Sequence, residues 1–387
     1  MKISVCMIVK NEEKYIKMCL ENVLKLSDEI IIVDTGSTDR TKEIINEFHG
    51  NIKTIDYKWE DDFSKARNIS IENATGDWIL MLDADEKLLC DSKKVREILE
   101  IADSDGYKIP LYNIMSTSMV LYSAVYCKFF RNNKGYRYQG SIHEQLNIPG
   151  IQTDKYIIDE KICKIIHYGY LMSVVQERNK SERNLKILKK QLKEKPNEPF
   201  IYYNIGASYE VAGDYEKALK YFFECNKLAS KESQTGITLY EIDMSKRIAE
   251  CLVKLEKYNE CIEFTDNLLS DKCYEGFVDL EYINGFCYYL KKDYEQAIKC
   301  FQKCILSGET KKFASVLGMG SFKPKFMMAK SYVELKDELK AINYFMESVF
   351  DSNNYIHVGV EEFRKYLKAV HREEILEQLN KQVSEKN

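Results

Sequence analysis

The stretch WILMLDADEKLL, residues 78–89, decides how the first part of this sequence is interpreted. Five apolar or aromatic residues, Trp78 to Leu82, predict a buried β-strand. Asp83, Asp85 and Glu86 follow at the end of that strand. Carboxylates placed this close repel one another, and each costs free energy when it loses its water. We therefore expect this strand end to face a cation, alone or on a phosphate group.

Short β-rich runs alternate with amphipathic helical stretches before and around this motif, which is typical of βαβ units and a largely parallel sheet. The expected strands are Ile3–Val9, Glu29–Asp34, Ile52–Asp56 and Trp78–Leu82, and the expected helices are Glu12–Leu26, Asp39–Phe48 and Phe63–Asn73. Ligands of such sheets gather at the carboxyl ends of the strands. VKNEE, DTGSTD and DADE stand at three of those ends, so we expect the binding site there.

The pattern changes after the first hundred or so residues. From Tyr107 to Tyr168, shorter aromatic and β-branched runs (GYKIPLYNIM, AVYCKFFR and GYRYQGSIHEQL) predict an added antiparallel segment. Beyond Ser173 the sequence is helical in character to its end.

An internal repeat dominates this helical part. Small and aromatic residues recur at offsets 0, 3, 12, 16 and 19 in two copies, with a third and a degraded fourth that follow the same spacing. The four sets are Gly206, Tyr209, Ala218, Phe222 and Cys225; Gly285, Tyr288, Ala297, Phe301 and Cys304; Ala329, Tyr332, Ala341, Phe345 and Ser348; and Ala249, Leu252, Cys261, Thr265 and Leu268. Small residues let paired helices approach while aromatics fill the groove, so residues 199–353 resemble tetratricopeptide repeats. A generic helical bundle is the alternative.

Composition narrows the class of protein. A length of 387 residues predicts two domains, and 61 acidic against 57 basic residues argue against nucleic acid as a partner. The twelve cysteines contain no CxxC pair, which favours reduced core thiols in a cytoplasmic protein. The N-terminus is interpreted as a first strand and not a signal peptide, and the absence of a run of 18 apolar residues predicts no membrane span.

Three segments in order carry a family resemblance. ISVCMIVKNEEKYIKMCLENVLKLSDEIIIVDTGSTDRT, DDFSKARN and GDWILMLDADE together resemble the family 2 glycosyltransferases, which have the GT-A fold. The resemblance implies an α/β, Rossmann-like nucleotide-sugar domain over residues 1–170, a helical linker over 171–198 and an all-α tetratricopeptide-like domain over 199–387.

The resemblance also implies a metal and a donor site. In that family the DxD motif holds Mn²⁺ or Mg²⁺ against the diphosphate of a nucleotide sugar, so Asp85 would bind the metal, Asp83 would lie near the ribose or a metal-bound water, and Ala84 would line the donor site. His167, at the end of a β-rich run, would add a further metal ligand. The alternatives are an acidic strand end that only caps the next helix, and a structural histidine.

DTGSTD and DDFSKARN complete the implied donor site. By the same resemblance Asp34, with Thr35, would recognise uracil or ribose, and Val9 and Lys10 would lie beneath the base. Arg67 is expected to pair with the diphosphate or with a nearby aspartate. Without the family, DTGSTD is an ordinary turn and helix cap, and Arg67 a surface ion pair.

Transfer also needs a base to take the proton of the acceptor. Glu144, in YQGSIHEQL, is the expected catalytic base, although the motif departs from the Glu-Asp pair of many family members. His143 could act instead, could orient Glu144, or could be structural.

These features favour a metal-dependent inverting glycosyltransferase that uses a UDP-sugar. The combination with repeats resembles the sublancin S-glycosyltransferase type, which modifies a peptide cysteine, so the acceptor is expected to be a peptide or protein side chain presented by the repeats. A cell-surface glycan acceptor, a repeat scaffold that has lost catalysis, and a nucleotidyltransferase are the alternatives, although no Gly-rich phosphate loop follows the first strand. The repeats could also form a homo-oligomer.

Overall fold

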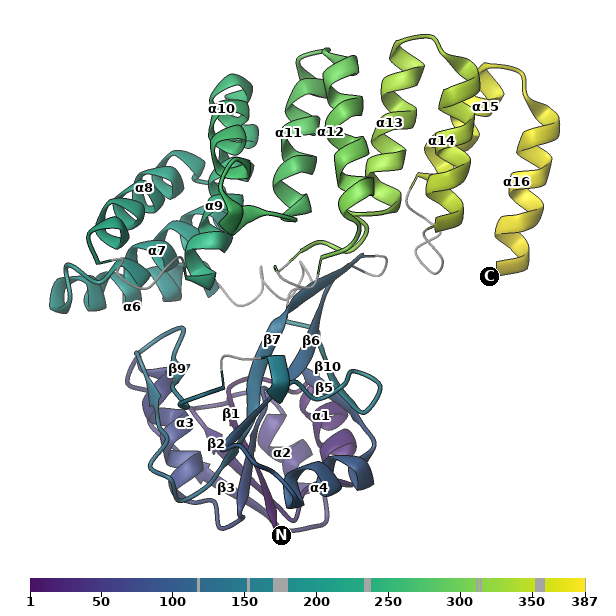
Figure 1. Cartoon of the computed structure of the whole chain (residues 1–387). Coiled ribbons are helices and arrows are strands. Elements are labelled where there is room, and N and C mark those ends of the chain that lie inside the picture. The colour runs from purple at the N-terminus through teal and green to yellow at the C-terminus, as the bar shows by residue number, and fades with distance from the viewer. Residues whose placement is uncertain are drawn as a thin grey trace. The chain divides into compact units, whose positions relative to one another are not determined.

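The computed structural model describes all residues except 117–118, 152–153, 170–179, 233–237, 311–312, 314, 352–358 and 387. The chain divides into two compact units (Figure 1). The first comprises residues 1–116 and 122–204, and the second residues 117–121 and 205–387. The predicted boundary at residue 170 and the first part of the predicted linker lie outside the described residues. The rest of that linker contains helix α6, Lys180–Glu194, which belongs to the first unit.

The first unit is built on an eight-stranded mixed sheet in the order β3-β2-β1-β4-β7-β6-β10-β5. Its strands are β1 (Ile3–Val9), β2 (Glu29–Asp34), β3 (Ile52–Asp56), β4 (Trp78–Met81), β5 (Glu86–Cys90), β6 (Gly106–Ser116), β7 (Met119–Arg131) and β10 (Cys163–His167). The predicted parallel arrangement is present in the first strands, where β1 pairs parallel with β2 and β4. The added segment joins the same sheet, because β7 pairs antiparallel with β4, and β10 lies parallel to β6 and antiparallel to β5.

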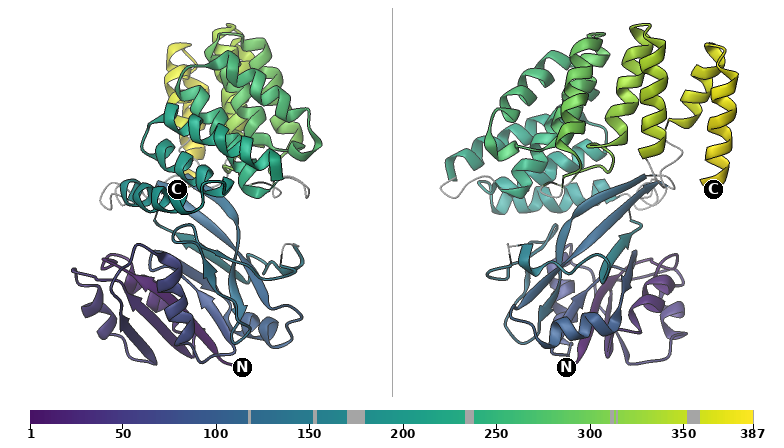
Figure 2. Two further views of the ribbon diagram at one scale, coloured as in Figure 1. Left: turned by 90° about the vertical axis from the view of Figure 1, so that its left-hand side faces the viewer. Right: turned by 45° about the vertical axis from the view of Figure 1, so that its right-hand side comes forward.

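Helices cover both faces of this sheet, as the two views in Figure 2 show. They are α1 (Ile16–Val23), α2 (Thr41–Asn46), α3 (Phe63–Glu72) and α4 (Ser92–Glu100), the first three of which are shorter than predicted. On one face, side chains of α1, α2 and α4 pack with Ile3, Val5 and Met7 of β1. On the other face, Cys6 of β1 packs with Ile71 of α3. Strand β1 is therefore buried on both sides, which explains its continuous apolar sequence.

The repeat helices follow. They are α7 (Pro199–Val211), α8 (Tyr215–Glu232), α9 (Leu239–Lys254), α10 (Tyr258–Leu269), α11 (Val278–Leu290), α12 (Tyr294–Ser307), α13 (Phe322–Glu334), α14 (Glu338–Asp351), α15 (Val360–Ala369) and α16 (Glu373–Lys386). The predicted role of the small residues is confirmed, because a Cβ atom on Gly206 would lie 2.6 Å from the ring of Phe222. A Cβ on Gly285 would lie 2.9 Å from the ring of Phe301, so both glycines permit close helix packing.

No helix of the described ranges is both long and apolar enough to cross a lipid bilayer. All twelve cysteines are free thiols in the structure. Of the nine in β1, α1 and the repeat region, eight are buried and Cys273 is exposed.

Candidate functional site

The turn between β4 and β5, with the first residue of β5, brings the three carboxylates of the DADE motif together, and each lies beside a different basic side chain. Asp83 Oδ1 lies 2.9 Å from Nη2 of Arg67, and Asp85 Oδ1 lies 3.5 Å from Nε2 of His167. Both carboxylate oxygens of Glu86 accept hydrogen bonds of 2.8 Å from Nζ of Lys128. The repulsion expected at this strand end is thus relieved by side chains of the protein itself.

These cations shift the protonation equilibria of the turn. Burial would raise the pKa of Asp83, but the positive charges of Arg67, Lys128 and His167 hold that pKa well below its usual range. Burial would lower the pKa of Lys128, but the charges of Glu86 and Asp83 outweigh it and raise the pKa. Asp83 and Lys128 are therefore both charged at neutral pH, whereas burial raises the pKa of Glu86 against the opposing charge of Lys128.

Asp85 and His167 form a pair of potential metal ligands, called the donor pair below. Nδ1 of His167 lies 2.7 Å from Oδ1 of Asn113, and since an amide oxygen only accepts, Nδ1 carries the proton. Burial would lower the pKa of His167, but its hydrogen bond to Asp85 and the charge of that carboxylate raise it. Nε2 donates to Asp85 while it is protonated, and its lone pair becomes available to a metal ion when that proton is lost. A Cβ atom on Gly169 would lie 2.5 Å from both Asp85 Oδ2 and His167 Nε2, so only glycine leaves room beside the pair.

The donor pair fits a divalent cation. A carboxylate oxygen and an imidazole nitrogen 3.5 Å apart can ligate one ion at roughly 2.0–2.2 Å each. The described part of the chain holds no group of three or more His, Cys, Asp or Glu side chains that could hold a metal. An ion held by Asp85 and His167 would thus keep positions for phosphate oxygens and water, as Mg²⁺ usually does.

Arg67, on α3, joins two distant carboxylates. Its Nε lies 2.5 Å from Oε1 of Glu144, and its Nη2 contacts Asp83. The guanidinium carbon lies 5.5 Å from the centre of the Tyr138 ring, a cation–π distance. Its Nη1 is buried and has no hydrogen-bond partner among the described residues, so one donor remains for a further acceptor. The sequence analysis expected Arg67 to pair with a diphosphate or with a nearby aspartate, and in the structure it pairs with Asp83.

A short hairpin positions Glu144. Strands β8 (Tyr138–Gln139) and β9 (Gln145–Leu146) flank it, and Asn68 of α3 exchanges hydrogen bonds of 2.9 and 3.0 Å with the backbone of Tyr138. The side chain of Glu144 is only 10% exposed. His143 is exposed and has a φ of +52°, a left-handed conformation that is uncommon outside glycine. Glu144, and not His143, therefore shares a guanidinium with the DADE turn.

The DTGSTD segment surrounds a second buried carboxylate. Oδ1 of Asp34 accepts hydrogen bonds of 2.8 Å from the N–H groups of Gly36 and Ser37, and Gly36 has a φ of +103° that this tight turn requires. Oδ2 of Asp34 is buried without a hydrogen-bond partner among the described residues. Thr35 donates both its N–H and its hydroxyl proton to the carbonyl oxygen of Val9, so it ties β2 to β1. Lys10, which follows Val9 in the sequence, is exposed.

Comparison with known protein families gives matches for both the sheet-containing part and the repeat part of the chain. Residues 4–165 match glycosyl transferase family 2, and residues 201–232 and 285–307 match the tetratricopeptide repeat. Residues 4–165 are a family 2 glycosyl transferase domain. The predicted resemblance and the predicted fold class, a GT-A-type α/β domain followed by all-α repeats, are both confirmed.

Three relatives of the family 2 domain and its repeats are informative. The chain is 33% identical over 226 residues to a TPR repeat-containing protein of Synechococcus elongatus, which covers 57% of this chain and 55% of that protein. It is 29% identical over 283 residues to the SPbeta prophage-derived glycosyltransferase SunS of Bacillus subtilis, over 72% of this chain and 64% of SunS. It is 27% identical over 209 residues to the lipopolysaccharide core biosynthesis glycosyltransferase LpsC of Rhizobium meliloti, over 48% and 76% respectively. The chain thus spans less than two thirds of the first two relatives.

Lys128 and Asn113 are site residues of the family 2 domain that the sequence analysis missed. Both come from the segment between the DADE motif and His167, on β7 and β6. A lysine within the apolar run AVYCKFFR was the available signal, because a buried lysine needs an anionic partner. Asn113 lies in an equally apolar run, but an amide carries no comparable signal.

Lys128→Met is expected to destabilise the family 2 domain by about 3 kcal/mol, because it leaves Glu86 buried without its cation. Urea unfolding of the variant and the parent protein measures the difference. Lys134→Met is the matched control, since Lys134 is 53% exposed and lies 3.9 Å from Asp105. Adding Glu86→Gln to Lys128→Met should recover part of the loss. Equal stability of the two lysine variants would contradict a structural role for Lys128.

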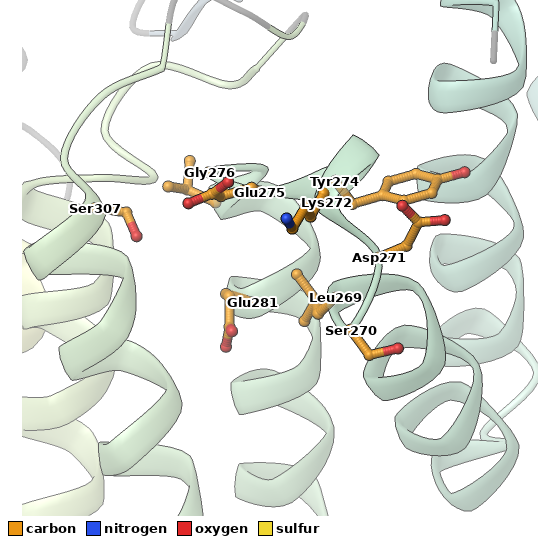
Figure 3. Close-up of a pocket in the computed structure, with 10 residues that line it drawn as sticks. Leu269, Ser270, Asp271, Lys272, Tyr274, Glu275, Gly276, Glu281 and Ser307 are labelled. Carbon is orange, nitrogen blue, oxygen red and sulfur yellow. The ribbon is translucent and has the colours of Figure 1, made fainter. Parts of the chain in front are cut away.

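A hollow of about 410 Å³ lies in the repeat region, between the end of α10, the start of α11 and the end of α12 (Figure 3). Asp271, Glu275 and Glu281 contribute carboxylates to its lining, and Lys272 contributes an amine. The buried Oε2 atom of Glu281 has no hydrogen-bond partner among the described residues. None of the predicted site residues lines this hollow, and its lining contains no histidine or cysteine.

Proposed function

We propose that this chain is a metal-dependent, inverting glycosyltransferase that transfers a sugar from a UDP-sugar to an acceptor. The observation that carries the proposal is the neighbourhood of the DADE turn, where the Asp85–His167 donor pair accompanies an Arg67 guanidinium that joins Asp83 to Glu144. The donor pair suits a divalent cation on a diphosphate, and Glu144 is a carboxylate able to accept a proton beside it.

Asp34 is the proposed reader of the nucleotide. A buried carboxylate oxygen that lacks a donor suits the N–H group of uracil or a ribose hydroxyl, and Oδ2 of Asp34 is such an atom. Val9 and Thr35 would form the floor of that site, with Lys10 at its exposed edge near the base. Ala84, buried between Asp83 and Asp85, would pack against the donor.

Asp85 and His167 are the proposed ligands of Mn²⁺ or Mg²⁺. Such a cation, when bound, neutralises negative charge on the departing diphosphate. Asn113 would keep the His167 ring in the tautomer that offers Nε2. Gly169 would leave the space that the donor needs next to both ligands. Asp83 would lie beside the ribose or a water of the metal shell, held there by Arg67.

Glu144 is the proposed base. The acceptor atom attacks the anomeric carbon from the side opposite the diphosphate while Glu144 takes its proton, which inverts the configuration in a single displacement. Arg67 holds the Glu144 carboxylate in position through its Nε, and its remaining Nη1 donor could contact a phosphate oxygen of the donor. His143 is the second candidate for the base.

We further propose that the repeats present a peptide or protein side chain to the family 2 domain, as the similarity to SunS and the repeat architecture both favour. The similarity to LpsC favours a glycan acceptor as the second candidate. Self-association through the repeats is a third use of the same surface. A reducing location such as the cytoplasm would suit twelve reduced cysteines.

Incubation of the full chain with a panel of nucleotide sugars and Mn²⁺, with and without EDTA, tests the activity. A glycosyltransferase is expected to consume one donor and to release free UDP, slowly even without acceptor. A nucleotidyltransferase would instead release pyrophosphate from a nucleoside triphosphate, and a scaffold would consume nothing. Labelled sugar recovered with protein supports the polypeptide acceptor, whereas label recovered in extracted glycolipid supports the glycan.

A further inference from the structure

Two cysteines outside the proposed site face each other across strands β5 and β10. The antiparallel register pairs Cys90 with Cys163, and four residues further along it pairs Glu86 with His167. Because side chains alternate along a strand, both pairs project from the same face of the sheet. Cys163 and the intervening Leu88 are buried in the core of that face, whereas Cys90 is partly exposed.

The backbone places the two sulfur atoms close together. The N–H of Asp91 donates to the carbonyl oxygen of Ile162 at 2.9 Å, so residues 91 and 162 are a hydrogen-bonded pair. Such pairs alternate with non-hydrogen-bonded ones in an antiparallel ladder, which makes Cys90 and Cys163 a non-hydrogen-bonded pair. The N–H of Cys163 agrees, since it donates to Asp159. Cα atoms in such a pair lie roughly 4.5 Å apart, within the range of roughly 4.4–6.8 Å that a disulfide spans.

Cys90 is the more reactive of the two thiols. The hydrogen bond from Cys163 lowers the pKa of Cys90 to about 7 against the opposing effect of burial, and Ser92, whose Oγ lies 3.8 Å from the Cys90 sulfur, adds to the lowering. Cys90 therefore has the thiolate character and the solvent access that oxidation requires, and Cys163 is the buried neighbour able to resolve the product.

We infer that Cys90 and Cys163 are a thiol pair that hydrogen peroxide converts to an intramolecular disulfide. The Cys90 thiolate attacks one oxygen of the peroxide, whose O–O bond breaks, and the second oxygen leaves as hydroxide and takes a proton to become water. The sulfur of Cys163 then attacks the sulfenic acid at Cys90. Its proton and the departing hydroxide form a second water, so two thiols lose two electrons and the peroxide gains them.

The crosslink ties together the two strands that carry Glu86 and His167. It closes a loop of roughly 70 residues, which restricts the unfolded chain and stabilises the family 2 domain. It lies at the far end of the β5–β10 ladder from Glu86 and His167, so those two side chains keep their places.

A second thiol pair supplies an internal control. Cys261 of α10 is hydrogen-bonded to Cys287 of α11, but both side chains are fully buried, so a dissolved oxidant cannot reach them in the folded protein. Cys273 is exposed, so its oxidation shows that the oxidant was active.

Treatment of the full chain with a small excess of hydrogen peroxide tests the inference. Peptide mapping without reductant is expected to show a Cys90–Cys163 disulfide before any Cys261–Cys287 disulfide, and reductant should reverse it. The thermal transition of the family 2 domain should rise by about 5 °C on oxidation. In Cys163→Ala, the shift should vanish, and a sulfenic acid at Cys90 should be trapped by dimedone.

Cys90→Ser, at the partly exposed position, provides a second variant in case Cys163→Ala unfolds, and should also abolish the shift. Oxidation of Cys273 while Cys90 and Cys163 stay reduced would overturn the inference. So would a Cys261–Cys287 disulfide that forms first, or an equal thermal shift in Cys90→Ser.

Discussion

Asp85→Asn is expected to remove most sugar transfer, by about 100-fold or more, while the fold stays intact. An amide oxygen is a poorer ligand for Mn²⁺ or Mg²⁺ than a carboxylate, and Asp85 supplies one of the two donors that the described residues offer to such an ion. The substitution keeps the size of the side chain, and Gly169 leaves space beside it.

Thermal shift with UDP and Mn²⁺ measures this loss separately from activity. The parent protein is expected to be stabilised by the mixture, and the variant by much less, since only the folded state binds the ligand. Asp91→Asn is the matched control: Asp91 caps α4 through the N–H of Lys94, and asparagine caps a helix equally well. Equal stabilisation of parent and Asp85→Asn would eliminate the proposed metal role.

The acidic turn was predictable because its signal is local. An apolar run followed at once by three carboxylates lies within a dozen residues, and the structure places all three in one turn. Their partners were not equally predictable. Arg67, Lys128 and His167 stand 16 to 82 residues away from the carboxylates they meet, and only the strand order brings them there. Strand β5 was missed because KLLC is too short and too mixed to show a period.

The repeats were predictable for the opposite reason. The two helices of a repeat are neighbours in sequence, so residues that contact one another stand at fixed short spacings. Each small residue therefore indicates which aromatic residue packs against it, as Gly206 does for Phe222. The predicted repeat spacing ends at residue 353, and α15 and α16 follow within the predicted all-α region and pack on α14 through Phe363 and Leu367. Their sequence departs from the repeat spacing, as terminal repeats often do.

Glu144 and His143 could not be separated by sequence, because neighbours on a loop share their local signals. The backbone separates them. A left-handed φ at His143 directs the chain through the turn, and the contacts of α3 with the hairpin bring Glu144 to Arg67. Position along the chain alone contains none of this information.

Glu144→Gln is expected to keep donor affinity but to lower turnover by about 100-fold or more, because glutamine preserves the shape of the side chain and cannot accept a proton. Its amide oxygen can still accept from Nε of Arg67, so Arg67 and Asp83 should remain paired and the thermal transition should change little. Single-turnover kinetics measure the effect on turnover, and UDP binding measures the effect on donor affinity. Glu72→Gln, an exposed position on the same helix as Arg67, is the matched control.

The pH dependence of the rate loss in Glu144→Gln also distinguishes an oxygen acceptor from a sulfur acceptor. A hydroxyl group stays protonated at neutral pH and depends on the base, so the deficit of Glu144→Gln should persist as the pH rises. A thiol ionises unaided as the pH approaches its usual pKa of about 8.5, so with a cysteine acceptor the deficit should shrink over that range. A near-normal rate at every pH, with every acceptor, would contradict the role of Glu144. His143→Gln would then be expected to show the large loss instead, and if neither variant does, the proton must leave the acceptor by another route.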